Sequence, residues 1–472
     1  MAKTREPDCA NTYICGETVK LERWLPLLLW GVLILGPLVV VTLFFAVDRD
    51  GGAFLTIANG ILDGKLPYRD FFDHKPPGIY IAFALVLALT KRSIWGIKVF
   101  LLLLSLGFGF FTNWSLQGLG FGKKTRWLGG TLGLLGWIIY QGYTPVTETL
   151  VACCLAAALA VLFSQRKGST FGAGFFLGLA TLTKQPVALL VIPFVAYASM
   201  VKGKRAGLIF LSAFVFSLGI AGAALWILGL GPSAWHQIVV VNFTNLPLGD
   251  IREIVKGNFN QFFLAPTLWI LAVLTPIFHR RRENYFLSAL LLFSWVPVFL
   301  RPISHYILVA LPAGVILAAM SAHWLIQQME LQGRYALVCL VGFPLWLQGL
   351  FPTMAAFSHN VLFLQRQVGV ELQTLTREND PILVIAAEPQ YYFFSHRYPP
   401  GEDLYLLAIN YSSGKESAMI AEIQKKTVRV IAVAENQYTE KYGSLVRDYV
   451  EHRCKKYAYF PNLQLYIWNK CQ

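Results

Sequence analysis

"DRDGGAFLTIANGILDGKLPYRDFFDHKPPGIY" occupies residues 48–80 and interrupts a strongly apolar part of the chain. An apolar run from about Leu25 to Val47 precedes it, and the apolar run "GIYIAFALVLAL" at residues 78–89 overlaps its end. Acidic, basic and aromatic residues fill the stretch. Charged side chains beside a membrane segment are costly unless they are paired, solvated or functional. The stretch therefore predicts an external loop with a functional role.

The composition indicates a polytopic α-helical membrane protein. The 472 residues are 56% hydrophobic and 14% charged, with a mean hydropathy of +0.52. Soluble domains carry roughly 25% charged residues, so the composition argues against a single soluble domain. The net charge of +14 comes as short clusters between apolar runs. Such clusters are topology signals, and no nucleic-acid partner is expected.

The apolar runs and basic clusters together predict the topology. The runs begin near Leu25, Ile94, Leu128, Thr149, Phe171, Val187, Ala206, Phe262, Tyr285, Ile307 and Tyr335. The basic clusters are residues 5–23, 123–126, 166–167, 202–205, 279–282 and Arg334. Placing every cluster in the cytoplasm gives about 11 transmembrane helices, a cytoplasmic N-terminus and an external C-terminus. We thus expect a multi-pass protein of the cell membrane.

This topology has two local consequences. Only one crossing fits between the first loop and Lys123, so residues 78–89 are expected to lie as a helix on the outer surface. Pro76 and Pro77 suit the first turn of that helix. Between Arg166 and Lys202 two short helices must cross, with "TLTKQP" (residues 181–186) at their outer turn.

The pattern changes near Glu371, which divides the chain into residues 1–370, the membrane domain, and residues 371–472. "PILVIAA", "VRVIAVA", "KKYAYF" and "LQLYIW" read as strands, while "SAMIAEIQKK" and "YGSLVRDYVEH" have helical period. We expect a small extracytoplasmic α/β domain with a mostly parallel sheet. Cys454 and Cys471 could form a disulfide in an oxidising compartment.

Several ionisable residues gather on the predicted outer side of the membrane: Asp50, Lys75, Glu148, Lys184, Arg301 and His305. Cations there could hold the phosphate of an anionic, lipid-linked substrate, and a carboxylate could take a proton.

Most of these residues also have a structural interpretation. Asp50 could cap the helix that follows it, with Asp48 as a partner of Arg49. Lys75 could extend to the membrane interface. Glu148 could be a first-turn acid, and His305 an interfacial ring. Lys184 lies in a tight turn close to hydrocarbon, which favours a functional role.

The first loop resembles that of GT-C glycosyltransferases, including bacterial proteins similar to dolichyl-phosphate-mannose protein mannosyltransferases and to the aminoarabinose transferase of lipid A. The resemblance rests on the opening acid, the helix and the "PYRD…KPP" segment within the first loop, residues 48–92. "TET" (147–149), "GLATLTKQP" (178–186) and "HYILVALPAGVILA" (305–318) match in the same order.

The resemblance implies a cell-envelope enzyme, a hexosyl- or pentosyltransferase, which moves a sugar from a polyprenyl-phosphate donor to an acceptor hydroxyl with inversion. It places Asp50 at the position of the general base and Glu148 at the acidic position of the second loop. Lys75 is implied to neutralise the lipid phosphate. Lys184, Arg301 and His305 are implied to contact phosphate or sugar. Gly51 stands where the family often has a second acid.

Other roles stay open in the sequence. Tyr68 and Arg69 either shape the loop or hold the donor, and Asp70 and Asp73 either pair with neighbouring cations or touch substrate. Asp50 and Glu148 could share a divalent metal, but two carboxylates do not specify a site. The acceptor could be a lipid, a protein or a glycan. The alternatives are a lipid or glycan transporter or flippase, and an enzyme that uses a lipid-linked oligosaccharide.

Overall fold

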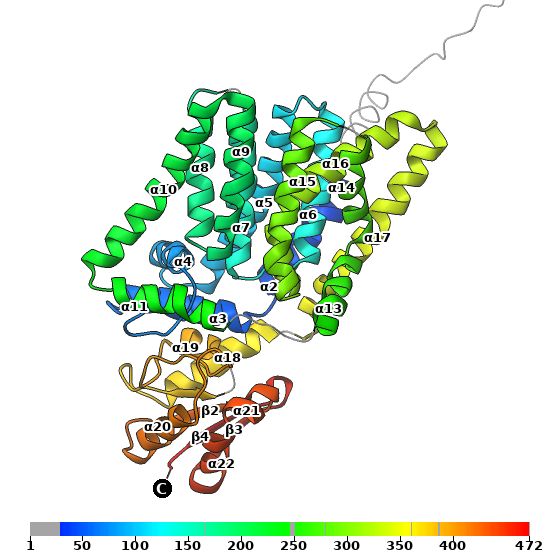
Figure 1. Ribbon diagram of the computed structural model, residues 1–472. Coiled ribbons are helices and arrows are strands. Elements are labelled where there is room, and N and C mark those ends of the chain that lie inside the picture. The colour runs from blue at the N-terminus through cyan, green and yellow to red at the C-terminus, as the bar shows by residue number, and fades with distance from the viewer. Residues whose placement is uncertain are drawn as a thin grey trace, which may run out of the picture.

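The computed structural model describes residues 29–164, 166–245, 251–278, 280–359, 361–385 and 388–471. It consists of a bundle of long helices with a smaller domain attached at one end (Figure 1). The start of the first apolar run and the basic cluster at residues 5–23 lie outside the described residues, as do His279 and Asp250.

The predicted apolar runs coincide with helices. These are η1 (Gly31–Leu35) with α2 (Gly36–Phe44), α5 (Ile94–Gly118), α6 (Lys123–Ile139), α7 (Thr147–Phe163), α8 (Ser169–Thr181), η2 (Gln185–Leu190) with α9 (Val191–Lys202), α10 (Lys204–Ile227), α14 (Pro266–Phe278), α15 (Arg282–Leu300), η4 (Ser304–Val309) with α16 (Leu311–Gln328), and α17 (Leu331–His359). Four helices in the described ranges are long and apolar enough to cross a membrane, or six if each of two bent pairs counts as one span. The number of crossings stays a prediction.

The basic clusters between helices gather at the end of the bundle away from the smaller domain. Lys202, at the end of α9, donates to the Leu162 carbonyl oxygen of α7 (2.8 Å) and to Ser169 Oγ of α8 (3.0 Å). Thr125 in the first turn of α6 forms a side-chain hydrogen bond with His323 of α16, with 2.7 Å between Oγ1 and Nδ1. The clusters therefore share one end, as the topology prediction requires.

Two short helices lie across the other end of the bundle. Helix α3 (Arg49–Leu62) turns by 63° from the preceding helical segment, and α4 (Gly78–Leu89) is seen nearly end-on where α8 and α9 stand upright (Figure 1). A helix of 12 residues is only about 18 Å long, too short for a hydrocarbon core of about 30 Å. The structure thus fits the expectation that residues 78–89 do not cross. The same end of the bundle also carries α11 (Gly231–Trp235), η3 (His236–Val240), α12 (Val241–Thr244) and α13 (Ile251–Phe263).

The C-terminal part is an α/β domain built on a four-stranded sheet of order β1-β2-β4-β3. Its elements are α18 (Val361–Thr374), β1 (Leu383–Ile385), α19 (Gln390–Ser395), α20 (Ser413–Gln424), β2 (Val430–Ala434), α21 (Gln437–Tyr442), α22 (Ser444–Arg453), β3 (Lys455–Phe460), η5 (Pro461–Leu463) and β4 (Leu465–Asn469). Every predicted strand and helix is present. The predicted boundary at residue 370 falls inside α18.

The expectation of a mostly parallel sheet is wrong. Only β1 and β2 are parallel, whereas β4 runs antiparallel to both β2 and β3. The turn η5 that joins β3 to β4 explains this, because so short a connection can join only antiparallel strands. Cys454 and Cys471, which flank this hairpin, form a disulfide.

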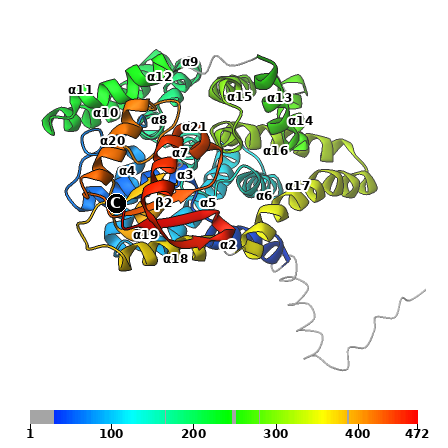
Figure 2. The ribbon, with the colours of Figure 1, turned by 90° about the horizontal axis from the view of Figure 1, so that it is seen from below.

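The hydrophobic cores do not follow the predicted domains. One core fills the helix bundle, with residues such as Trp137, Leu159 and Phe194. The other joins α3 and α4 to the C-terminal domain, with Phe54 and Tyr80 in the same cluster as residues of α18, α19 and the sheet. The first loop is therefore packed as part of the C-terminal domain, which Figure 2 shows in front of it when the molecule is seen from below.

Candidate active site

The N-terminus of α3 presents the first acid of the site. Asp48 caps the helix, because its Oδ1 accepts a hydrogen bond from the Gly51 amide (3.1 Å). Arg49 pairs with Asp50 (Nε to Oδ1, 3.0 Å), so the capping role considered for Asp50 and the Asp48–Arg49 pair are both wrong. The Asp50 side chain keeps 30% of its surface exposed. With Asp48 as the cap, the Asp50 carboxylate stays accessible.

Two glycines let other segments approach α3 closely. A Cβ atom on Gly51 would lie 2.4 Å from Pro145 Cγ and 2.6 Å from Asp48 Oδ1. A Cβ atom on Gly52 would lie 2.4 Å from the Gln390 amide nitrogen of the C-terminal domain. Contacts this short are excluded for real side chains. The structure therefore explains why position 51 carries no second acid.

Nearby charges set the ionisation of these acids. Burial raises the pKa of Asp50, but the positive charges of Arg49 and Lys75 outweigh this and hold it well below its usual value. Burial and the neighbouring Asp50 raise the pKa of Asp48 to about 6. Asp50 is therefore ionised at neutral pH and ready to accept a proton or a hydrogen bond.

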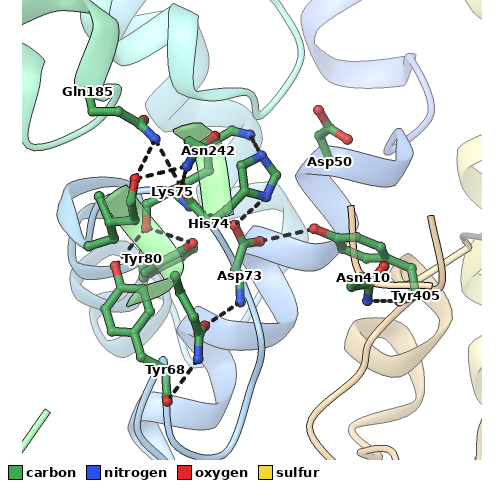
Figure 3. Close-up of polar contacts among 12 residues, drawn as sticks. Asp50, Tyr68, Asp73, His74, Lys75, Tyr80, Gln185, Asn242, Tyr405 and Asn410 are labelled. Atoms are coloured by element: carbon green, nitrogen blue, oxygen red, sulfur yellow. Dashed lines mark hydrogen bonds and ion pairs between the residues drawn. The ribbon is translucent and has the colours of Figure 1, made fainter. Parts of the chain in front are cut away.

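Side chains from several segments hydrogen-bond to the backbone of the loop that carries Lys75 (Figure 3). The Tyr68 hydroxyl donates to the Lys75 carbonyl oxygen (2.7 Å), and the side chains of Gln185 and Asn242 both donate to the His74 carbonyl oxygen (3.1 and 2.9 Å). Asp73 accepts from the Lys75 amide (2.9 Å). These bonds fix the Lys75 backbone beside the helix that bears Asp50.

The Lys75 side chain itself is largely buried, at 9% exposure, and its ammonium lies 2.5 Å from His74 Nε2. Burial and the Lys75 charge lower the pKa of His74 well below its usual value, so His74 is neutral. No carboxylate of the described residues lies within the 4.0 Å ion-pair limit of Lys75 or Arg301. Among the described residues, therefore, neither cation is neutralised by an acidic side chain.

Glu148 and Lys184 form an ion pair between α7 and the turn before η2. The side chains are 2% and 4% exposed, and Glu148 also accepts from the Thr147 hydroxyl (2.8 Å). The Lys184 ammonium lies 3.3 Å from the centroid of the Tyr306 ring. Glu148 is thus enclosed by its partners, unlike Asp50.

A cavity of about 140 Å³ brings the cations together. Its charged or titratable lining residues are Lys75, Lys184, Arg301 and His74, and its other lining residues are Gln185, Pro186, Asn242, Pro297, Leu300 and Tyr306. Arg301 is held by the Asn245 carbonyl oxygen, 3.4 Å from its Nη2. His305 lies next to the cavity, within electrostatic range of Asp50 and Glu148. A cavity with three cations suits a phosphate group.

Two residues considered for donor binding lie elsewhere. Arg69 pairs with Asp70 (2.7 Å) and keeps 56% of its side chain exposed, outside the cavity. Tyr68 is 2% exposed and uses its hydroxyl on the Lys75 backbone, at a left-handed φ of 65°. Tyr68 therefore shapes the loop, and the structure gives Arg69 no contact with the site.

The C-terminal domain adds residues that sequence reasoning missed. The Tyr405 hydroxyl reaches Asp73 Oδ2 (3.5 Å), and the ring of Tyr438 lies 5.3 Å from the Arg49 guanidinium carbon. Burial raises the pKa of Glu388 to about 7, and this carboxyl group accepts hydrogen bonds from the side chains of Gln390 and Asn436. Nothing near these residues in the sequence marks them. Gln185, by contrast, follows Lys184 directly in "TLTKQP".

Lys98 is a further missed residue, on α5. It is fully buried and donates from Nζ to the Phe45 carbonyl oxygen (2.7 Å). This bond fixes the chain just before Asp48. A lysine within an otherwise apolar helix was the signal that could have found it.

A metal bound by Asp50 and Glu148 has little support in this arrangement. Asp50 faces Arg49, and Glu148 is taken up by Lys184 and Thr147. Within the described part of the chain, no group of three His, Cys, Asp or Glu side chains is arranged to hold a metal ion. We therefore derive no step through a metal.

Comparison with known proteins bears on the fold. No protein-family model and no curated protein matches the sequence. The chain is similar to the crystal structure of ArnT from Cupriavidus metallidurans in the apo state, with a TM-score of 0.60, 12% identity, and coverage of 96% of this chain and 98% of that one. It is also similar to the same organism's ArnT bound to undecaprenyl phosphate (TM-score 0.58, 14% identity, coverage of 93% and 97%). The match covers nearly both whole chains, so this protein has the GT-C fold that its first loop predicted.

Proposed function

We propose that this protein is a membrane glycosyltransferase that moves a sugar from a polyprenyl-phosphate donor to an acceptor hydroxyl at the outer face of the membrane. The observation that carries the proposal is the cavity lined by Lys75, Lys184 and Arg301 beside the ionised Asp50. The fold supports it, because a structure of the similar protein ArnT is described as bound to undecaprenyl phosphate.

In the proposed reaction, the acceptor oxygen attacks the anomeric carbon of the donor while Asp50 takes the hydroxyl proton. The bond between that carbon and the phosphate oxygen breaks, and its electron pair leaves with the polyprenyl phosphate. A single displacement of this kind inverts the anomeric configuration. Lys75 and Arg301 neutralise the charge that develops on the leaving phosphate.

Donor binding strengthens Asp50 as a base. The charges of Lys75 and Arg49 hold its pKa low in the free protein. A bound phosphate offsets the Lys75 charge, which lets the pKa of Asp50 rise toward the operating pH, where a general base is most effective. The order of events is then donor first and acceptor second.

Glu148 is proposed as a positioning residue. Its buried carboxylate holds the Lys184 ammonium at the wall of the cavity, against the Tyr306 ring. Lys184 then faces the phosphate with part of its charge balanced, and Arg301 and Lys75 supply the remaining attraction.

The test is to incubate the purified protein with a panel of polyprenyl-phosphate sugars and to follow release of polyprenyl phosphate by mass spectrometry. The panel includes hexose, pentose and aminosugar donors, each with lipid, peptide or glycan acceptors. Release that depends on both donor and acceptor supports the proposal. Absence of release with every monosaccharide donor, together with release from a lipid-linked oligosaccharide, points to the oligosaccharide-using enzyme instead.

A transporter is the remaining alternative. It calls for ionisable groups near the middle of the membrane, whereas Lys75, Lys184 and Arg301 lie in loops or turns and Glu148 in the first turn of its helix. Lipid-linked sugar that crosses proteoliposome membranes without cleavage would establish transport and exclude the transferase.

A further inference from the structure

A second cavity, of about 420 Å³, lies between the start of α5 and the exposed side of α18. Its lining has a basic part, Arg92 and Arg366, and an aromatic part, Trp95, Phe363, Phe393 and Phe394. Ser93, Ile94, Gln367, Val370, Gln373 and His396 complete it. No carboxylate belongs to this lining. The cavity thus combines positive charge with an apolar wall.

The two arginines are held differently. Arg366 is exposed, and its guanidinium carbon lies 5.7 Å from the centroid of the Trp95 ring. Arg92 pairs with Asp63 at the end of α3 (2.6 Å) and is also a lining residue of the cavity. Arg366 therefore carries the unbalanced charge, and Arg92 joins the cavity to the first loop.

The cavity lies at the level where a candidate membrane helix begins. Helix α5 starts at Ile94, is 25 residues long and meets the length and hydropathy needed to cross a bilayer. Apolar side chains around its start face outward, with Leu89 at 85% and Val99 at 49% exposure. Arginine and tryptophan at the end of a membrane helix mark the headgroup region.

We propose that this cavity binds the anionic headgroup of a membrane phospholipid. The phosphate would lie between Arg92 and Arg366, and the acyl chains would run along Phe363, Trp95 and the exposed side chains of α5. Because Phe393 and His396 belong to the C-terminal domain, the lipid would contact both that domain and the membrane helices.

The site is separate from the proposed donor cavity. The two linings share no residue. In the view from below, α18 lies beside α2 at one edge of the molecule, and α15, which lines the donor cavity, lies at the opposite edge (Figure 2). Binding here therefore does not depend on the proposed transfer reaction, and neither does its test.

The test compares the full-length protein with Arg92→Gln/Arg366→Gln in detergent. Phosphatidylglycerol, phosphatidylcholine or inorganic phosphate is added to each protein. Native mass spectrometry measures the bound lipid, and thermal unfolding measures the unfolding temperature. Of the three additives, only phosphatidylglycerol should stay bound to the natural protein and raise its unfolding temperature. Loss of two basic contacts near a membrane surface should weaken this binding about tenfold to thirtyfold.

Three variants control the result. Lys425→Gln/Arg447→Gln removes the same charge from exposed pairs elsewhere in the C-terminal domain and should bind phosphatidylglycerol normally. Lys75→Gln should also bind it normally, because it alters only the donor cavity. Arg366→Gln alone changes an exposed side chain, so it should fold and still show several-fold weaker binding.

Two outcomes would overturn the proposal. One is equal binding of phosphatidylglycerol by the natural protein and by both Arg366 variants. The other is equal stabilisation by inorganic phosphate or phosphatidylcholine, which would mean that the cavity does not select an anionic lipid.

Discussion

Asp50 and Glu148 are two carboxylates of the same site in opposite surroundings. Asp50 stands on the first turn of α3 with 30% of its side chain exposed and Arg49 as its partner. Glu148 stands on the first turn of α7 with 2% exposed, closed in by Lys184 and Thr147. The resemblance to GT-C enzymes implies an acidic position for each, but of the two only Asp50 keeps an appreciable part of its side chain exposed. We propose that the two acids have different roles, in which Asp50 reacts and Glu148 holds a cation.

Replacing the reactive acid should give the largest effect on activity. Asp50→Asn keeps the size of the side chain but removes the base, so transfer should fall by about 10²–10⁴-fold. The unfolding temperature should change little, since Asp48 caps the helix. Transfer assays with purified protein measure the first effect, and thermal unfolding measures the second. Normal transfer by this variant would contradict the assignment.

Breaking the enclosed pair should instead act on stability. Lys184→Met leaves Glu148 buried without its cation, which should cost about 3–5 kcal/mol. Glu148→Gln/Lys184→Met, with no charge left, should regain much of that loss and still bind donor weakly. Thermal unfolding of the single and double variants measures the coupling.

Lys425→Met is the matched control, because its exposed pair with Glu422 should contribute less than about 1 kcal/mol. If Lys184→Met is as stable as this control, the two carboxylates do not differ in the way we describe.

Adding a second acid beside Asp50 sharpens the comparison. Gly51→Glu would create the acid pair that the resemblance to GT-C enzymes implies, but its Cβ would collide with Pro145 and Asp48. We expect a loss of about 1–3 kcal/mol in stability and no gain in transfer. Gly219→Ala, where a Cβ meets nothing within 4 Å, should leave both properties unchanged. A stable and more active Gly51→Glu protein would show that the acid pair can be rebuilt.

Glu388 is a third acid, and its ionisation should make the stability of the protein depend on pH. Its pKa is raised to about 7 in the folded protein, mainly by burial, from an ordinary value of 4.5. The folded state therefore binds the proton more tightly, so stability is fullest below pH 4.5 and falls as the pH rises through 7. The loss should be at most about 3 kcal/mol.

Glu388→Gln should flatten this pH dependence, which unfolding temperatures between pH 4.5 and 8 would measure. Glu435→Gln, which changes an exposed acid at the end of β2, serves as control. A profile that stays steep in Glu388→Gln would mean that another group titrates.

The helices were predictable from the sequence because a membrane segment needs a long apolar run and a turn needs a break. "TLTKQP" and "HKPPG" were therefore placed correctly between helices. The sheet was predicted less well. The strands at residues 455–460 and 465–469 were found, but their antiparallel pairing depends on the short turn between them, which was not considered.

Some residues of the candidate site could be predicted, because they lie in short charged segments that interrupt apolar runs. Lys75, Lys184 and Arg301 were selected for this reason, and they line one cavity. The resemblance placed Asp50 at the position of the general base, but the sequence did not show that Asp48 caps the helix, because a cap and a free acid two residues apart look alike in sequence. Glu388, Tyr405 and Tyr438 lie in the last part of the chain, and only the folded structure brings them to α3.

The core that α3 and α4 share with the C-terminal domain has a consequence for biosynthesis. Thr56 donates to the carbonyl oxygen of Pro389, 333 residues later in the chain (3.1 Å). A ribosome therefore delivers the first loop to the membrane long before the segment that completes its packing. Until translation ends, α3 lacks the hydrophobic neighbours that the C-terminal domain supplies. The core around α3 can therefore be completed only after the last part of the chain has been translated and folded.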